Sequence, residues 1–183
     1  AKRETPARIP SLDDARREAD AMAKLGARFI FWGDPGYPPL LALLADAPAM
    51  LAVQGDAALL AQVPSFAIVG ARNASAAGRR IAEDIAEALT EAGVLVISGL
   101  ARGVDAAAHQ GALRVGRTLA VLPGGLDVAY PPENAALQAR IGREGALVAE
   151  HALGTAPLAR HFPKRNRIVA GLSLGVLVVE AAE

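Results

Sequence analysis

From residue 65 onward, short apolar runs alternate with segments of helical periodicity, and this alternation constrains the fold more than any other feature of the chain. Apolar runs without a polar residue at every second position are typical of strands buried on both faces of a parallel sheet. The predicted strands span 65–70, 94–99, 118–124, 146–150 and 175–181. Helices are predicted over about 75–93, 105–115, 132–142 and 165–173. Strands and helices joined by short connections favour an α/β fold with a doubly wound parallel sheet.

Some boundaries of these elements can be predicted from single residues. Ser75 is expected to cap the first helix of this region, which would direct Ile81, Ile85 and Leu89 inward and end at Gly93. The last predicted strand is apolar enough to be buried. Because the chain ends directly after it, we expect the chain to be truncated at its C-terminus.

The first 62 residues lack this regularity and are predicted to form a smaller N-terminal lobe. Ser11 and Asp14 have the spacing of a helix-capping box. The predicted elements are a helix over 12–25, a strand over 28–32, a helix beginning at Pro38 and Pro39, and a strand over 50–55. We therefore predict a flexible segment 1–10 and one domain over 11–183, in which 11–62 is the lobe and 63–183 is the core.

Composition limits the class of protein. The 19 Lys and Arg residues balance the 19 Asp and Glu residues, so the protein is not coated in positive charge, although a local basic patch is compatible with this balance. The absence of cysteine excludes disulfides and thiolate chemistry. The longest uncharged run, 57–71, is shorter than the roughly 20 residues of a membrane span, and residues 1–10 lack the apolar stretch of a signal peptide. We expect a cytoplasmic protein that does not enter membranes.

The loops that follow the predicted strands carry residues suited to ligand binding. In open parallel sheets, ligands bind beyond the carboxyl ends of the strands, where helix N-termini direct free N–H groups outward. These loops are 69–75, 98–105, 123–134 and 161–167. A single glycine in them is more simply explained by a turn, and Asp105 by an N-cap that can also contact a ligand. Four glycine-rich or basic loops at one edge together indicate a phosphate site.

The loop at 161–167 differs from the others by its charge. The cations in and beside it are Arg160, Lys164, Arg165 and Arg167. No Asp or Glu occurs between Glu150 and Glu180, so we expect these cations to be uncompensated and, with Arg72, to neutralise several phosphates. Phe162 and Tyr130 are placed either to stack bases or to anchor their loops to the core. Cations beside aromatic rings favour single-stranded nucleic acid over one nucleotide.

Motifs of the common nucleotide-dependent enzymes are absent from the sequence. It contains neither G-x-G-x-x-G, which argues against a dinucleotide oxidoreductase, nor G-x-x-x-x-G-K-[ST], which excludes a P-loop NTPase. His109, His151 and His161 lack the spacing of metal ligands, and His109 is interpreted as a packed or hydrogen-bonded side chain. No Ser/His/Asp set of specific spacing is found. We predict no catalytic residue, no metal and no cofactor.

Several long motifs occur in a fixed order along the chain. They read IVGARNASAAG, VISGLARGVDAAAHQGAL, TLAVLPGGLDVAYPPENAAL, GALVAE and FPKRNRIVAGLSLGVLVVEA. In this order they resemble the core of the DNA-processing protein A family, DprA, also called Smf. The segment DPGYPPLLALLADAPAMLAVQGD resembles the N-terminal part of that family, so the resemblance covers about residues 25–183.

The resemblance implies an extended Rossmann-like, three-layer fold with a mainly parallel sheet, and a protein that binds single-stranded DNA without catalysing a reaction. Members of the family protect incoming DNA during natural transformation and load the RecA recombinase onto it. Carried over by motif, the residues expected to bind DNA or its phosphates are Gly70, Ala71, Arg72, Ser98, Gly99, Gly103, Asp105, Phe162, Lys164, Arg165, Asn166 and Arg167. The family forms homodimers largely through a later part of its core, which this sequence lacks, so the homodimer and the RecA contact stay open for this fragment.

Two alternatives belong to other functional classes. PGG at 123–125 resembles the start of the PGG-x-G-T-x-x-E motif of nucleoside-monophosphate phosphoribohydrolases, on a related fold. In such an enzyme Glu133 or Asp127 would act as the general acid or base, although LDVAYP follows here, without the GT pair or a Glu at the required spacing. The other alternative is a sensor that binds one small nucleotide in the same pocket.

Overall fold

The computed structural model describes residues 10–62 and 64–181, so nearly all of the predicted flexible segment 1–10 lies outside the described residues. Seven strands form one sheet in the order β1-β2-β6-β5-β4-β3-β7. Their bounds are β1 (Ala27–Phe31), β2 (Met50–Gly55), β3 (Ser65–Gly70), β4 (Leu95–Ser98), β5 (Thr118–Leu122), β6 (Ala146–Ala149) and β7 (Gly175–Val179). The five strands from β6 to β7 are parallel, whereas β1 pairs antiparallel with β2 and β2 antiparallel with β6. The predicted α/β fold with a mainly parallel sheet is confirmed.

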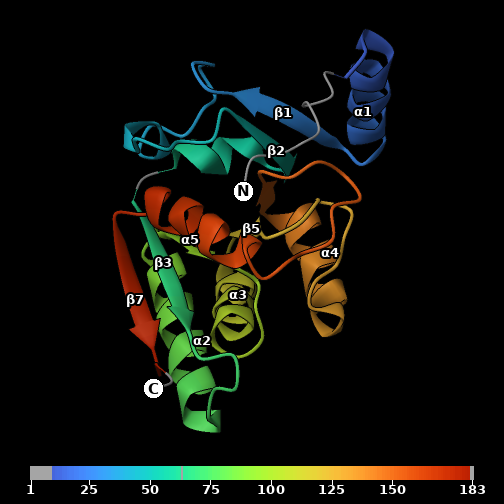
Figure 1. The fold of residues 1–183 in the computed structure, drawn as a ribbon. Coiled ribbons are helices and arrows are strands. Elements are labelled where there is room, and N and C mark those ends of the chain that lie inside the picture. The colour runs from blue at the N-terminus through green and yellow to red at the C-terminus, as the bar shows by residue number, and fades with distance from the viewer. Residues whose placement is uncertain (1–9, 63, 182–183) are drawn as a thin grey trace.

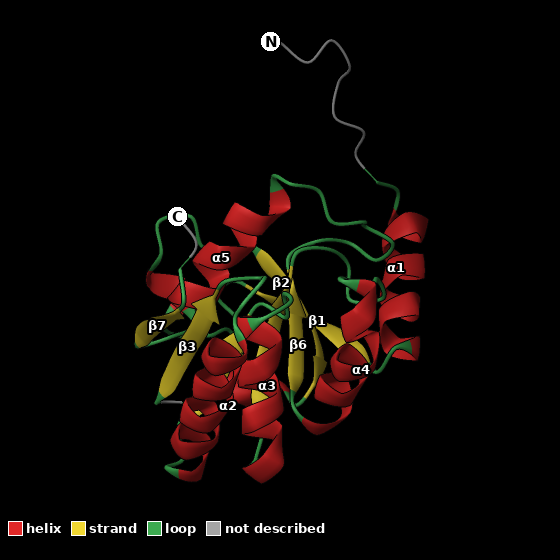
Figure 2. Cartoon of the chain, turned by 90° about the horizontal axis from the view of Figure 1, so that it is seen from below, coloured by secondary structure: helices red, strands yellow, loops and turns green. Residues whose placement is uncertain are grey.

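Helices cover both faces of this sheet and complete three layers (Figure 1). They are α1 (Leu12–Lys24), α2 (Ala76–Glu91), α3 (Val104–Val115), α4 (Ala135–Glu144) and α5 (His161–Gly171), with short 3-10 turns η1 (Leu41–Leu43), η2 (Ala57–Ala61) and η3 (Pro132–Asn134). Figure 2 views the face that α2, α3 and α4 cover. No helix within residues 10–62 and 64–181 is long and apolar enough to cross a bilayer.

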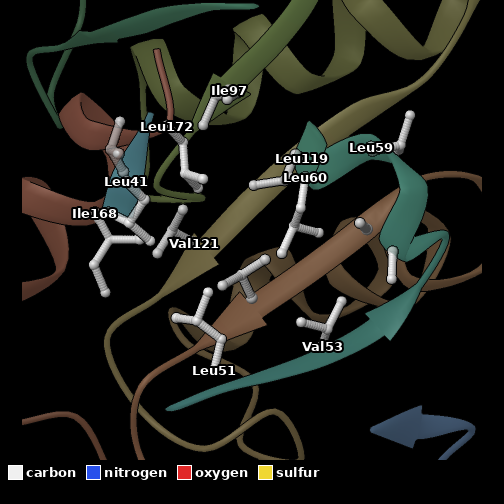
Figure 3. Close-up of a cluster of buried hydrophobic side chains, with 14 of the residues drawn as sticks. Leu41, Leu51, Val53, Leu59, Leu60, Ile97, Leu119, Val121, Ile168 and Leu172 are labelled. Atoms are coloured by element: carbon white, nitrogen blue, oxygen red, sulfur yellow. The ribbon is translucent and has the colours of Figure 1, made fainter. Parts of the chain in front are cut away.

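α5 covers the opposite face of the sheet, together with η1 and η2. Ile168 of α5 and Leu172, the residue that caps its C-terminus, pack with Leu41 of η1 over Leu119 and Val121 of β5, and all five side chains are buried (Figure 3). This cluster fixes α5 across β5, and the position of α5 decides where its basic side chains lie.

The inward face of α2 differs from the prediction. Ile81 is 50% exposed, whereas Ala82 and Ala86 are fully buried. The reason is the close packing of α2 on α3, where a Cβ on Gly111 would lie 2.2 Å from the backbone oxygen of Glu83. Helices that approach so closely require small side chains at the contact, so the larger Ile81 lies outside it.

Three further predictions, on the start of α5, the length of η1 and the burial of β7, are also corrected. The stretch 161–167 is the start of α5 rather than a loop, because Pro163 lies in the first helical turn, where a missing N–H costs no hydrogen bond. The helix predicted from Pro38 is only the short turn η1, whose neighbour Leu44 packs in extended conformation against Gly171. β7, predicted to be buried, is an edge strand paired with β3, and its Val178 is 58% exposed.

Candidate nucleic-acid interface

A cavity of about 750 Å³ opens between α5 and the strands β3 and β7, towards the carboxyl edge of the sheet. The predicted site residues that line it are Gly70, Ala71, Arg72, Asp105, Phe162, Arg165 and Asn166. A smaller hollow adjoins it and shares Arg72, Phe162 and Arg165 with it, adding Gly99 and Tyr130. Three of the four predicted loops therefore meet at one place on the sheet edge, together with the first turns of α5.

The glycines of these loops have packing reasons for lacking a side chain. A Cβ on Gly70 would lie 1.9 Å from the backbone oxygen of Val179, and one on Gly99 would lie 1.7 Å from a guanidinium nitrogen of Arg165. Gly103 has a φ of +75° and packs against the backbone oxygen of Ala71. Gly99 is therefore needed to make room for Arg165.

Arg165 is the most enclosed cation of the site, with only 6% of its surface exposed. Its guanidinium donates to the backbone oxygens of Gly99 and, at 2.8 Å, Val121, which lie at the carboxyl ends of β4 and β5. Burial lowers the pKa of Arg165 and the charge of Arg72 lowers it further, whereas Asp105 raises it. A guanidinium nevertheless stays protonated in a protein, so Arg165 is a fixed, buried positive charge.

Asp105 supplies the nearest negative charge and is 4% exposed. The N-cap of α3 is Gly103, and not Asp105 as the sequence had predicted. Asp105 lies in the first turn of the helix, and its carboxylate accepts from the backbone N–H of Ala101 at 3.3 Å. Burial raises the pKa of Asp105, and the charge of Arg165 opposes this shift. The N-terminus of α3, a position that attracts anions in helices generally, thus holds a carboxylate of the protein itself.

An exposed cluster of one cation and two aromatic rings borders both hollows. The guanidinium of Arg72 lies 4.7 Å from the ring centroid of Phe162, within the range of a cation–π interaction. The rings of Phe162 and Tyr130 are 5.6 Å apart and inclined by 58°. Tyr130 is 38% exposed, so the aromatic surface is accessible from solvent.

The remaining predicted residues do not line the main cavity. Ser98 lies beneath it, fully buried: its hydroxyl donates to the backbone oxygen of Ile68 at 2.6 Å, and hydrogen bonding by its side chain opposes the rise that burial causes in the pKa of Asp105. Lys164 and Arg167 line a separate hollow of about 690 Å³ on another side of α5. The guanidinium of Arg167 forms an ion pair with Glu150 and lies 3.5 Å from the carboxylate of Asp46. The expectation that no carboxylate compensates the basic stretch is therefore wrong for Arg167.

Sequence reasoning did not select Arg102, which lies in the smaller hollow beside Arg72 and Tyr130. The available signal was its position in the loop 98–105, where it is the only cation. Arg102 forms an exposed ion pair with Glu133 at 3.4 Å.

The candidate acids, bases and metal ligands are engaged in structural contacts. Both carboxylate oxygens of Asp127 accept from the backbone N–H of Gly154, at 2.8 and 3.0 Å. His109 is fully buried beside Thr118, with 2.8 Å between its Nδ1 and the hydroxyl, and burial lowers its pKa to about 3. The interpretation of His109 as a packed, hydrogen-bonded side chain is confirmed. Within the described part of the chain, no group of three His, Cys, Asp or Glu residues is placed to hold a metal ion.

A doubly wound, mainly parallel sheet with helices on both faces defines a Rossmann-like α/β protein, and here a cluster of Arg72, Phe162 and Tyr130 lies at its carboxyl edge. The profile of the DNA recombination-mediator protein A family matches residues 28–183. The chain belongs to this family, which confirms the predicted relationship.

Individual relatives agree with this assignment. The chain is 44% identical over 149 residues to DNA processing protein DprA of Streptococcus pneumoniae, covering 81% of this chain and 52% of that protein. It is 47% identical over 150 residues to protein Smf of Escherichia coli, covering 80% of this chain and 39% of that protein. Across the curated relatives it matches, the chain spans between 39% and 56% of their length, or about half.

Two solved structures have the same fold. The X-ray structure of DprA from S. pneumoniae superposes with a TM-score of 0.81 at 39% identity, covering 93% of this chain and 61% of that one. DprA from Helicobacter pylori superposes with a TM-score of 0.77 at 29% identity, covering 85% of this chain and 69% of that one. The H. pylori structure is described as showing a unique single-stranded DNA binding mode.

Proposed function

We propose that this chain is a non-catalytic protein that binds single-stranded DNA. Arg72 and Arg165 contact phosphates of the strand, and its bases stack on Phe162 and Tyr130. The observation that carries the proposal is that two arginines, Arg72 and Arg165, line the same two hollows as the ring of Phe162. Arg72 lies over Phe162, and both line the two hollows that Arg165 also lines. Two cations this close, with the nearest carboxylate buried behind one of them, favour an anion between them.

The accessible aromatic surface favours a single strand over a duplex. In a duplex the bases are stacked on one another, so their faces cannot lie against Phe162 or Tyr130, whereas unpaired bases can. The exposed cations Arg160 and Lys164 continue the positive charge along α5 beyond the aromatic cluster. A strand with several phosphates matches this arrangement better than one nucleotide does.

The phosphoribohydrolase alternative has no support in this geometry. Asp127 caps a backbone N–H, and Glu133 is paired with Arg102. Asp105 lies in the first turn of α3, so a negative charge is already present where a helix N-terminus would otherwise attract the phosphate of one nucleotide. Lys164, Asn166, Arg167 and the glycines of the loops are retained in the proposal as residues that contact or shape the DNA site.

The wider role follows from the family and is a proposal for the whole protein. We infer that it acts in the cytoplasm, where it protects incoming DNA in natural transformation and delivers that DNA to RecA. Homodimerisation belongs to the same proposal. The relatives are about twice as long as this chain, so these roles are to be tested on a protein of their full length.

The direct test is fluorescence anisotropy of a labelled oligo-dT of about 15 nucleotides, compared with a duplex of equal length. We expect preference for the single strand, and affinity that falls steeply between about 50 and about 200 mM salt as counterions are released. Arg72→Ala is expected to weaken binding about tenfold and to reduce the salt slope by about one phosphate. Arg143→Ala, which removes an exposed cation from the last turn of α4, is the matched control and is expected to bind like the unmodified chain.

Equal affinity for duplex and single strand, or a flat salt response, would contradict the proposal. Release of free base from AMP would favour the enzyme instead. Tight binding of one mononucleotide without binding of oligonucleotides would favour the sensor.

A further inference from the structure

We propose that the hollow lined by Asp46, Glu150, His151, Pro163, Lys164 and Arg167 binds a further phosphate of the same DNA strand, and that protonated His151 takes part in binding it. The hollow has a volume of about 690 Å³. This inference rests on the proposed function, because it adds a second phosphate subsite to the strand held by Arg72 and Phe162.

The two sites are joined by the first turn and a half of α5. Phe162 lines the first cavity, and Pro163 and Lys164 line the second. Phe162 and Lys164 are about 3 Å apart along the axis of α5 but about 200° apart around it, so their side chains leave the helix on different sides. Both lie at the start of α5, so a strand whose base stacks on Phe162 reaches Lys164 by passing around the N-terminal end of the helix.

The charges around the hollow explain why a proton matters there. The carboxylates of Asp46 and Glu150 both face the guanidinium of Arg167, which neutralises one of their two charges. Exposed Lys164 and Arg160 supply two further cations, so the group has a small net positive charge while the histidines are neutral. Protonation of His151 doubles that net charge and adds a hydrogen-bond donor for a phosphate oxygen.

The two histidines beside the hollow are not equivalent. Their rings are stacked, with centroids 4.2 Å apart and planes inclined by 28°, so protonating both would place two cations in contact. Nδ1 of His161 accepts from the backbone N–H of Leu158 at 3.3 Å, which requires a free lone pair on that nitrogen. This nitrogen of His161 therefore faces the backbone, and His151 is the one of the two rings that lines the hollow and can meet a phosphate there.

The direction of the pH effect follows from the surroundings of His151. In the free protein, burial holds its pKa below 6.5, and His161, Lys164 and Arg160 lower it further, against the opposing effect of Glu150. A bound phosphate reverses the local charge and raises this pKa, so binding takes up a proton. Affinity therefore rises as the pH falls from the pKa of the complex towards the pKa of the free protein.

Histidine NMR provides the first measurement, because the chain has only three histidines. The Cε1–H resonances are followed over pH with and without oligo-dT, since thymine does not titrate near neutral pH. We expect the pKa of His151 to rise when DNA is bound. His109 serves as the internal control and is expected to stay neutral in both states, because burial holds its pKa at about 3. An unchanged titration of His151 in the complex would overturn the inference.

Anisotropy of the variants provides the second measurement. Oligo-dT affinity is expected to rise about three- to tenfold from pH 8 to pH 6, since one proton gives at most tenfold per pH unit. His151→Gln is expected to abolish this rise, whereas His151→Lys, with a permanent charge, is expected to bind tightly at both pH values. A rise that survives in His151→Gln would belong to another group, such as Asp105, and would overturn the inference.

The two proposals fail in different ways. A chain that binds no oligonucleotide at any pH in this range contradicts the proposed function itself. A chain that binds single strands with Arg72-dependent affinity, but without any pH dependence, contradicts only the phosphate subsite at His151.

Discussion

Replacement of Arg165 by methionine tests whether this residue is a structural cation as well as a DNA contact. Methionine has similar length and leaves little cavity, so the change removes mainly charge and hydrogen bonds. Three losses follow from the structure. The backbone oxygens of Gly99 and Val121 lose their donor, and the buried carboxylate of Asp105 loses the positive charge that opposes its desolvation.

The expected magnitude is large for one substitution. Leaving a buried charge without its partner costs about 3–5 kcal/mol, and we take about 3 because the guanidinium bonds the carbonyls rather than the carboxylate itself. Each carbonyl left without its donor adds about 1 kcal/mol. The free energy of unfolding is therefore expected to fall by about 5 kcal/mol. For a chain of this size, this lowers Tm by roughly 10–20 °C.

Urea unfolding followed by circular dichroism measures this loss, and two further results identify its cause. Arg165→Met with Asp105→Asn is expected to recover about 3 kcal/mol, because the unpaired charge is gone. In the single variant the pKa of Asp105 rises further above that of the unfolded chain. The stability lost at neutral pH is then partly regained as the pH falls through the folded-state pKa and the carboxyl is protonated. A single variant within about 1 kcal/mol of the unmodified chain, with no gain from Asp105→Asn, would refute this reasoning.

Two smaller predictions concern neighbouring contacts. Gly99→Ala places a methyl group against the guanidinium of Arg165. We expect it to lower the free energy of unfolding in urea by about 1–3 kcal/mol and to weaken oligo-dT binding. Unchanged values in both assays would contradict the packing role of Gly99. Glu180 accepts from the hydroxyl and backbone N–H of Ser75, and these hydrogen bonds lower its pKa in the folded state. Its contribution to stability is therefore present at neutral pH and is lost as the pH falls through this lowered pKa. In Ser75→Ala the pKa of Glu180, measured by NMR titration of its carboxyl, is expected to rise. An identical pKa in both chains would show that the hydroxyl has no effect.

The parallel part of the fold could be predicted because its strands are buried on both faces and contain almost no polar side chains. The predicted bounds of β3, β4, β5 and β6 agree with the structure to within two residues at each end. The attachment of β2 beside β6 could not be predicted, because pairing between segments about a hundred residues apart leaves no local pattern in the sequence. The prediction that Ile81 faces the core was wrong for a related reason, because the close contact of α2 with α3 depends on Gly111, which lies in the other helix.

The site was predictable as a set of residues but not as an arrangement. In the sequence, Lys164, Arg165 and Arg167 look alike, because each is a cation far from any carboxylate. On α5 successive residues turn by about 100°, so Arg165 reaches the ends of β4 and β5 while Arg167 reaches Glu150. The ion pair of Arg167 with Glu150 could not be predicted, because the two residues are far apart in sequence and meet only where the end of β6 lies beside α5. Only Lys164 has the exposed position that the linear sequence implied for all three.

The position of Asp105 gives the proposed DNA site its form. In a doubly wound fold, helix N-termini at the carboxyl edge of the sheet are places where ligand phosphates bind, and here a buried carboxylate lies in the first turn of α3. That carboxylate stabilises Arg165, which in turn lies in the space that Gly99 leaves open. The positive charge is thus moved outward from the helix N-terminus to Arg165 and Arg72, beside the ring of Phe162. An anion bound there lies at the surface of the edge, where the phosphates of a strand can continue along α5 in a way that a nucleotide enclosed at the N-terminus of α3 could not.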